Sequence, residues 1–173
     1  MASKVVYRNR WMTVREDRIV RPDRSEGIYG FLEKPDFAVV VPAERGGFHL
    51  VEEYRYPIGA RTWSFPQGSF PDRRAVDPER LGRAELAEET GLHAATMTVL
   101  GFLHGAHGTS DQGFTVFLAT GLTPGEPARE PEEQDMVHRF VPRAEFCRMV
   151  RAGVITDSST LAAYGLLLMH EQG

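Results

Sequence analysis

The sequence has few of the features expected of a secreted, membrane-bound or nucleic-acid-binding protein. Its 173 residues include one cysteine, Cys147, so no disulfide can form within the chain. No apolar run approaches the ~20 residues that a membrane-spanning helix needs, and residues 1–4 lead into no apolar signal core. The formal net charge of −4 argues against a broad basic surface for nucleic acid or anionic lipid. We therefore expect a cytoplasmic protein that binds neither nucleic acid nor membrane.

The length suits one domain with a single core, and we take residues 1–173 as that domain. Apolar periodicity and turn residues predict strands at 11–20, 28–33, 37–41, 48–54, 96–103, 114–119 and 136–141, and helices at 78–90, 144–151 and 160–171. Segments 63–77 and 123–134 are rich in turn-forming residues and are predicted loops. This order of elements predicts an α/β fold, a mixed β-sheet sandwich flanked by helices on both sides.

The predicted helix at 78–90 has sequence signals at both ends. Asp77 can cap its first turn, and Pro78 has the fixed φ that suits a first helical position. Gly91 can end the helix in a left-handed conformation. The sequence therefore predicts where this helix begins and where it ends.

Three glutamates on this helix, Glu85, Glu88 and Glu89, fall within an arc of about 100°. No lysine or arginine follows any of them at four residues, and like charges at such spacings cost roughly 0.2–0.5 kcal/mol per pair. They also lie in the C-terminal half of the helix, where its dipole disfavours anions. Such conflicts with local rules indicate a functional site. Clustered carboxylates suit Mg²⁺ or Mn²⁺, although a solvated acidic face would have the same spacing.

The residues around these glutamates resemble the Nudix box. Residues 68–92 begin with glycine and end in AELAEETGL, where the family has Arg-Glu-apolar-x-Glu-Glu-x-Gly-apolar. Outside the box, YRYP at 54–57, FPQG at 65–68, and residues 153–157 and 161–163 look like ADP-ribose pyrophosphatases. The resemblance implies the Nudix fold and a metal-dependent hydrolase that cleaves the diphosphate bond of a small nucleotide derivative. ADP-ribose, cleaved to AMP and ribose 5-phosphate, is the expected substrate.

The sequence departs from the family pattern in three places. The family's box arginine, which orients the glutamates, is Ala84 here, and the adjacent Arg83 faces nearly the opposite side of the helix. The spacing from Gly68 to Glu85 is two residues longer than in the family. The family's early box glutamate has no clear counterpart, since Arg74 stands six residues after the glycine. These departures leave open a nucleotide-sensing domain without catalysis, against which the three intact glutamates argue.

The resemblance assigns metal and phosphate ligands to individual residues. Mg²⁺ or Mn²⁺ would be held by Glu85, Glu89 and the backbone carbonyl of Gln67, with Glu88 assisting. Arg55 would contact the substrate phosphates, because its guanidinium offers two parallel hydrogen bonds. The alternative for Arg55 is an ion pair with an acidic neighbour at 52 or 53.

The resemblance also assigns the catalytic base to the acidic loop that contains Glu132 and Glu133. Alignment at residues 135–136 makes Glu132 the group that accepts a proton from the attacking water, and a shift of one residue makes it Glu133. A mobile loop can carry such a base into place once substrate is bound. The alternative is a solvated acidic loop.

Two aromatic residues, Tyr29 and Phe31, lie where the family uses an N-terminal strand to sandwich adenine, often across a dimer. Aromatic residues at i and i+2 in a strand are also typical of a core. We expect a homodimer to whose interface the N-terminal strands, at about 5–35, contribute. A second candidate function is a Nudix pyrophosphatase for a nucleotide sugar or another nucleoside diphosphate derivative.

Overall fold

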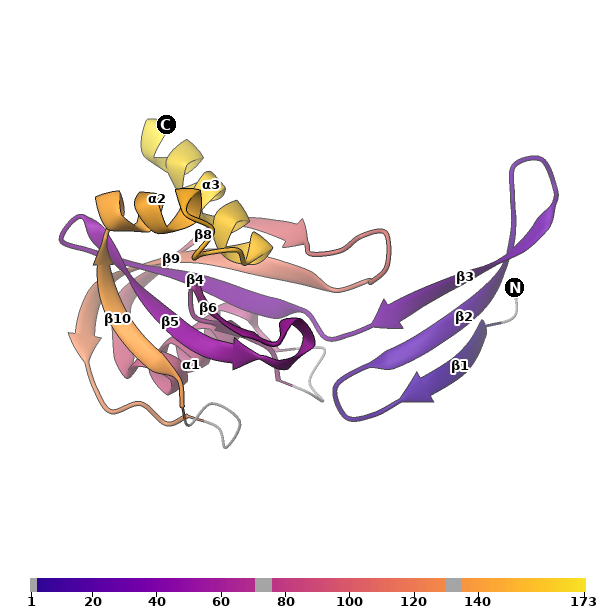
Figure 1. Cartoon of the computed structure of the whole chain (residues 1–173), viewed down its shortest axis with the longest axis horizontal. Helices are drawn as coiled ribbons and strands as arrows, with labels where there is room; N and C mark the ends of the chain where they lie inside the picture. Colours follow the sequence, from indigo (N-terminus) through magenta and orange to yellow (C-terminus); the bar gives the residue numbers. More distant parts are fainter. Residues whose placement is uncertain (1–2, 71–75, 130–134) are drawn as a thin grey trace.

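The computed structural model describes residues 3–70, 76–129 and 135–173 (Figure 1). Its elements are β1 (Ser3–Arg8), β2 (Thr13–Val20), β3 (Glu26–Glu33), β4 (Phe37–Glu44), β5 (Gly47–Arg55), the 3-10 helix η1 (Tyr56–Ile58), β6 (Ala60–Ser64), β7 (Gln67–Gly68), α1 (Pro78–Thr90), β8 (Leu92–His104), β9 (Gly113–Pro124), β10 (Val137–Pro142), α2 (Arg143–Arg151) and α3 (Ser158–Gln172).

The body of the molecule is a mixed sheet with helices on both faces. Its strand order is β10-β5-β4-β9-β8, with β6 added to β5 and β7 added to β4. The central pair β4 and β9 is parallel, and the other pairs are antiparallel. In Figure 1, α1 lies on one side of the sheet and α2 and α3 lie on the other. The predicted α/β sandwich with helices on both sides is confirmed.

The sequence of strand β4 is continuously apolar because both faces of the strand are buried. Its side chains alternate between the two faces of the sheet. Val39 and Val41 pack in one cluster with residues of α2 and α3, whereas Val40 packs with Leu86 of α1 in another. All three valines are fully buried. The predicted strand at 37–41 is confirmed, and the sheet it anchors fixes the position of α1.

Helix α1 begins and ends at the predicted residues. The side chain of Asp77 accepts a hydrogen bond from the backbone N–H of Glu79 at 3.3 Å, and Pro78 is the first helical residue. Gly91 has a φ of 74°, and its N–H donates to the carbonyl of Ala87. Because both ends are fixed, the three glutamates of its last turns have a defined position relative to the sheet.

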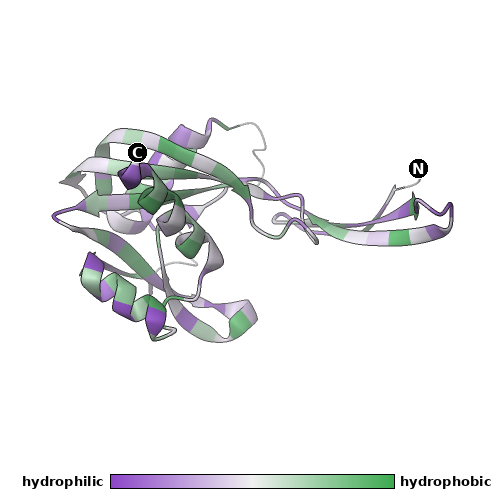
Figure 2. Ribbon diagram, turned by 90° about the horizontal axis from the view of Figure 1, so that it is seen from above, coloured by the Kyte–Doolittle hydropathy of each residue, from purple (hydrophilic) through white to green (hydrophobic). Residues whose placement is uncertain are grey.

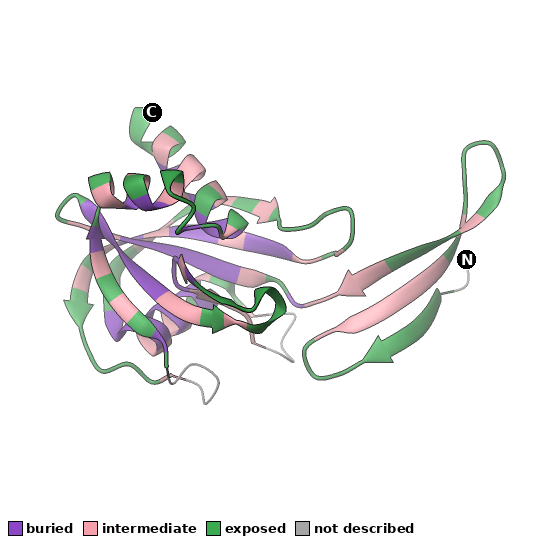
Figure 3. Cartoon of the chain, in the orientation of Figure 1, coloured by how far each residue is buried: buried purple, intermediate pink, exposed green. Residues whose placement is uncertain are grey.

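The N-terminal strands β1, β2 and β3 form a separate antiparallel sheet, residues 3–33, that we call the arm. It extends away from the body (Figure 1) and is exposed or half-buried throughout (Figure 3). Several of its exposed side chains are large and hydrophobic, and in Figure 2 hydrophobic and hydrophilic residues alternate along it. The arm joins the body where Leu32 donates to the Thr109 carbonyl at 2.8 Å and accepts from the Asp111 N–H at 3.1 Å.

Three strands were not predicted, namely β1, β6 and β7, and β7 lies wholly within the segment 63–77 that was predicted as loop. β1 reads SKVVYR, and all six of its residues are exposed, so it lacks the alternation that marks a half-buried strand. β6 overlaps the segment that was predicted as loop because of its turn-forming residues. Within the described residues, no helix is long and apolar enough to span a bilayer.

Candidate active site

A cavity of about 700 Å³ lies where α1, β7, the end of β5 and the base of the arm meet. It brings together four residues that the sequence predicted as site residues: Arg55, Gln67, Glu85 and Glu88. The other residues that line it are Trp11, Lys34, Pro35, Glu53, Tyr54, Tyr56, Pro57, Gly68, Ser69 and Phe70. The cavity therefore combines carboxylates, cations and aromatic rings.

The carboxylate of Glu85 is packed against Gly68 of β7. A Cβ built on Gly68 would lie 2.6 Å from the carboxyl carbon of Glu85 and 2.8 Å from its Oε1, so only glycine leaves room for this carboxylate. Glu85 is buried. The box therefore begins with glycine because the carboxylate of Glu85, 17 residues later, occupies the space that a Cβ would fill.

The three box glutamates differ in their surroundings. Glu85 and Glu88 line the cavity, whereas Glu89 is only 1% exposed and is not among the described residues that line it. Among the residues that the structure describes, no three histidine, cysteine, aspartate or glutamate side chains are grouped so that they could hold a metal ion. The predicted role of the three glutamates in binding a metal stays a prediction.

The donor groups that are present nevertheless fit a hard divalent cation. Mg²⁺ is usually held by one or two carboxylates, with water and substrate phosphates completing its octahedron. Glu85 and Glu88 supply two carboxylates at the cavity, and the space that Gly68 leaves for Glu85 keeps one of them at its wall. A site that depends on substrate oxygens does not need three converging side chains.

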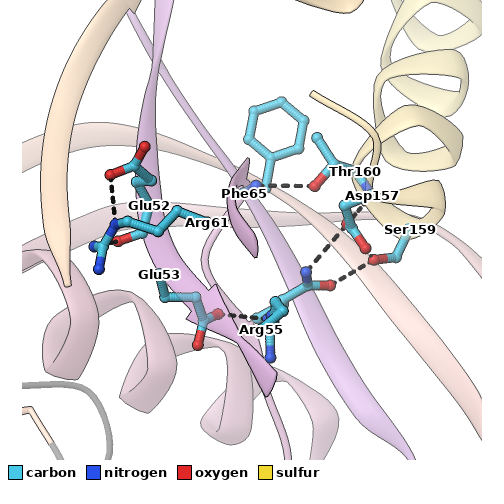
Figure 4. Close-up of polar contacts among 9 residues, drawn as sticks. Glu52, Glu53, Arg55, Arg61, Phe65, Asp157, Ser159 and Thr160 are labelled. Atoms are coloured by element: carbon cyan, nitrogen blue, oxygen red, sulfur yellow. Dashed lines mark hydrogen bonds and ion pairs between the residues drawn. The ribbon is translucent and has the colours of Figure 1, made fainter. Parts of the chain in front are cut away.

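The side chain of Gln67 is held by the N-terminus of α3. Its Nε2 donates to Asp157 Oδ2 at 3.1 Å, and its Oε1 lies 2.5 Å from the hydroxyl of Ser159. Asp157 also caps α3 by accepting from the Thr160 N–H at 2.8 Å (Figure 4). The predicted metal-binding role requires only the backbone carbonyl of Gln67, and the side-chain contacts fix that residue in place.

Burial raises the pKa of Asp157, but hydrogen bonds from Ser159, Thr160 and Gln67 outweigh it, and the pKa lies below its ordinary value. Asp157 is therefore ionised at neutral pH, which strengthens its cap on α3. The hydroxyl of Thr160 accepts from the backbone N–H of Phe65 at 2.9 Å (Figure 4). These contacts tie α3 to the segment that leads into β7.

Arg55 forms the ion pair that was the alternative prediction for it, and its contact with substrate phosphates stays a prediction. Its guanidinium forms an ion pair with Glu53 at 2.5 Å, and it also lines the cavity (Figure 4). Glu53 is the partner because residues i and i+2 of a strand share a face. Glu52 lies on the other face of β5 and pairs with Arg61 at 2.9 Å. The Arg55 side chain is 41% exposed, so it can turn from Glu53 toward a bound phosphate.

Tyr29 and Phe31 lie on β3 of the arm, and neither is among the described residues that line this cavity. Neither belongs to the buried core: Tyr29 is exposed and Phe31 is half-buried. The Tyr29 hydroxyl donates to the carbonyl of Gly108 at 2.7 Å. Within one chain the structure therefore does not bring these two rings to the carboxylates.

Trp11 is the aromatic residue of the arm that does line the cavity, and the sequence reasoning did not single it out. It lies in the turn between β1 and β2, where the side chain of Asn9 accepts from the Trp11 N–H at 2.8 Å and from the Met12 N–H at 2.9 Å. This local turn is the signal that could have fixed the position of the indole. Glu132 and Glu133, the predicted bases, lie outside the described residues.

The chain is similar to several known proteins. Residues 2–32 match the family model described as the nucleoside diphosphate sugar hydrolase N-terminal domain. An ADP-ribose pyrophosphatase of Mycobacterium tuberculosis (strain ATCC 25618 / H37Rv) is 39% identical over 134 residues, which are 77% of this chain and 63% of that protein. An ADP-ribose pyrophosphatase of Bacillus subtilis (strain 168) is 27% identical over 135 residues, 78% of this chain and 72% of that protein.

A solved structure has the same fold. It is described as an ADP compounds hydrolase, and it superposes with a TM-score of 0.84 over 100% of this chain and 94% of its own, at 20% sequence identity. The similarity therefore extends over the arm as well as the body. The alignment with the Mycobacterium tuberculosis protein spans less than two thirds of that relative's length.

Proposed function

We propose that this chain, an ADP-ribose pyrophosphatase-like protein of the Nudix family, is a Mg²⁺-dependent hydrolase that cleaves ADP-ribose to AMP and ribose 5-phosphate. The observation that carries the proposal is the cavity in which Arg55, Gln67, Glu85 and Glu88 meet. These residues come from β5, β7 and α1, so their proximity is a product of the fold and not of sequence spacing.

The residues of the cavity divide the work between metal and substrate. Glu85, Glu89 and the Gln67 carbonyl would hold Mg²⁺, with Glu88 assisting; Glu85 and Glu88 line the cavity, and Glu89 is buried. The bound ion would neutralise the diphosphate and stabilise charge that develops at phosphorus. Mn²⁺ has similar ligand preferences and could take its place.

Two cations and a carboxylate of the chain would act on the substrate directly. Arg55 would exchange its ion pair with Glu53 for two parallel hydrogen bonds to a phosphate. Lys34 lines the same cavity and would add a second positive charge. Glu132 would accept a proton from the attacking water, with Glu133 as the alternative base; such a base typically contributes about 10²–10⁴-fold to the rate.

A nucleotide sugar is the second candidate substrate, because the matching N-terminal model describes nucleoside diphosphate sugar hydrolases. The two substrates share a nucleoside diphosphate and differ in the group beyond the second phosphate. The carboxylates and Arg55 would treat them alike, so the distinction is made by the residues that contact that distal group.

The test is hydrolysis of a panel of nucleotide diphosphate derivatives by purified protein in Mg²⁺, with separation of the products. We expect ADP-ribose to give AMP and ribose 5-phosphate with the highest kcat/KM, and all hydrolysis to stop in EDTA and return with excess Mg²⁺ or Mn²⁺. Preference for a nucleotide sugar would select the second candidate. Cleavage that continues unchanged in chelator would refute the metal-dependent mechanism.

We also propose that two chains form a homodimer through the arm. The arm exposes a set of large hydrophobic side chains on a three-stranded sheet, namely Val5, Val6, Tyr7, Val20, Ile28 and Tyr29. None of the described residues of the arm is buried, and burial against a partner would remove apolar surface from water. Dimerisation would also offer Tyr29 and Phe31 to the partner's cavity, which they do not line in their own chain.

The dimer is tested by light scattering on the intact chain and on a variant with Val6→Lys and Ile28→Lys, two exposed positions of the arm. We expect the mass of two chains for the natural protein and of one for the variant. A natural protein that remains monomeric at the concentrations used for activity would contradict the dimer and leave the metal-dependent chemistry to its own test.

A further inference from the structure

The C-terminal end of α1 lacks a cation of its own. Residues 78–90 are all described, and no basic residue lies in the last turn of the helix. The family's orienting arginine is replaced by Ala84. Arg83 does not compensate, because its guanidinium binds Glu79 at 2.9 Å and the carbonyl of Ala94 at 2.7 Å. The negative pole of the helix dipole at this end favours a cation supplied by another segment of the chain.

The segment that follows β9 docks against this end. The N–H of Gly125 donates to the Gly91 carbonyl at 2.6 Å, and the N–H of Ala128 donates to the Glu88 carbonyl at 3.1 Å. Carbonyls at the end of a helix have no partner within the helix, so each of these bonds satisfies a group that would otherwise need water. The segment is therefore fixed to the turn of α1 that carries the box glutamates.

Arg129 ends this docked segment and connects it to α1 and to the residue that precedes β10. Its Nε donates to the carbonyl of Glu89 at 3.3 Å, and one of its terminal nitrogens donates to the carbonyl of Met136 at 2.5 Å. Met136 is buried and directly precedes β10. The planar guanidinium thus bridges the last turn of the box helix and the start of β10, the edge strand of the larger sheet, which the compact ammonium of lysine could not do with the same geometry.

We propose that Arg129 is a positioning residue that takes over the part of the missing box arginine. It would hold the last turn of α1 against the start of β10, and so keep Glu88 and Glu89 in the orientation that metal binding requires. Its permanent charge would also offset the repulsion among the three glutamates and the negative end of the helix. This inference rests on the proposed metal-dependent function, and it assigns no contact with substrate to Arg129.

The experiment compares Arg129→Gln, Arg129→Lys and the matched control Arg83→Gln, which also removes an arginine bound to a backbone carbonyl near α1. Mn²⁺ binding by electron paramagnetic resonance gives a readout that needs no turnover, and thermal melting reports folding. We expect Arg129→Gln to weaken Mn²⁺ binding and to lower kcat, each by roughly 10–100-fold, with little change in KM. Arg129→Lys should fall between it and the natural protein, and Arg83→Gln should match the natural protein.

The decisive measurement is whether a second substitution restores the lost Mn²⁺ affinity and kcat. If Arg129 replaces the box arginine, Ala84→Arg in the Arg129→Gln background should restore most of the Mn²⁺ affinity and kcat. Arg129→Gln binding Mn²⁺ as tightly as Arg83→Gln would overturn the proposal, and so would a loss that Ala84→Arg leaves unrepaired. Should Arg129→Gln fail to fold, Arg129→Lys alone and with Ala84→Arg makes the same comparison. Natural protein that binds Mn²⁺ but does not cleave ADP-ribose would count against the proposed function only.

Discussion

Gly68→Ala perturbs the candidate site by the addition of one methyl group. The new Cβ would stand 2.6 Å from the carboxyl carbon of Glu85, and ordinary van der Waals contact begins at 3.4 Å. The carboxylate must therefore move. Glu85 lines the cavity, so its displacement changes the wall at which the metal is proposed to bind. Gly68 has no positive φ, and the substitution should act on the carboxylate and not through backbone strain.

The cost in stability and the cost in function should be very different. The methyl group meets the far end of a side chain, so the strain is that of an off-rotamer glutamate, about 0.5–1.5 kcal/mol. Restriction of the unfolded chain by alanine offsets part of this, by about 0.4–1 kcal/mol. A metal ligand displaced by about 1 Å, in contrast, is expected to lower the rate by roughly 10²-fold.

The assay is kcat for ADP-ribose at saturating Mg²⁺, with the melting temperature of each variant. Gly165→Ala is the matched control, since a Cβ there meets nothing within 4 Å and the position lies inside α3. We expect Gly165→Ala to be fully active and more stable by about 0.5–1 kcal/mol. Gly68→Ala should melt near the natural protein and lose most of its activity. A folded Gly68→Ala protein with normal kcat would refute the claim that this glycine places a metal ligand.

Three further outcomes are expected. Glu132→Gln should lower kcat strongly with little change in the Mg²⁺ titration, whereas Glu133→Gln should not; steady-state kinetics that show both variants fully active would place the base elsewhere. Burial, with nearby imidazole and guanidinium charges, lowers the pKa of His138 to about 4. Because the unfolded chain binds this proton first, stability should be complete above pH ~6.5 and fall by about 1–3 kcal/mol, after screening, as the pH drops to ~4; urea titrations of His138→Gln should show a flatter profile. Asp157→Ala should lower the free energy of unfolding by about 0.5–2 kcal/mol through loss of the α3 cap, and an unchanged urea midpoint would contradict that role.

The parts of the fold that the sequence predicted are those with local causes. Helix α1 was predicted to the residue because Asp77, Pro78 and Gly91 act within one turn of its ends. The apolar run at 37–41 predicted a strand covered on both faces, and it is buried on both. β1 was missed because its exposure in the arm leaves no alternation to detect.

The parts of the site that were not predicted depend on contacts between distant residues. The side chain of Gln67 meets Asp157 and Ser159, 90 and 92 residues further along the chain. No local pattern reports such a contact. Trp11 reaches the cavity through the position of the arm, and Arg129 reaches Glu89 across 40 residues. The carboxylates were predicted from the box, whereas the groups that contact them were identified only from the structure.

The central claim is that the box carboxylates hold a divalent cation for diphosphate hydrolysis. Its most direct test is Glu85→Gln and Glu89→Gln, each assayed for ADP-ribose hydrolysis in Mg²⁺ and for Mn²⁺ binding, beside thermal melting. Both variants should stay folded, because removal of like charge from one helix face relieves repulsion. We expect kcat to fall by roughly 10²-fold, together with Mn²⁺ affinity. Near-normal turnover and Mn²⁺ binding in both folded variants would contradict the account and leave these buried glutamates without a role in metal binding.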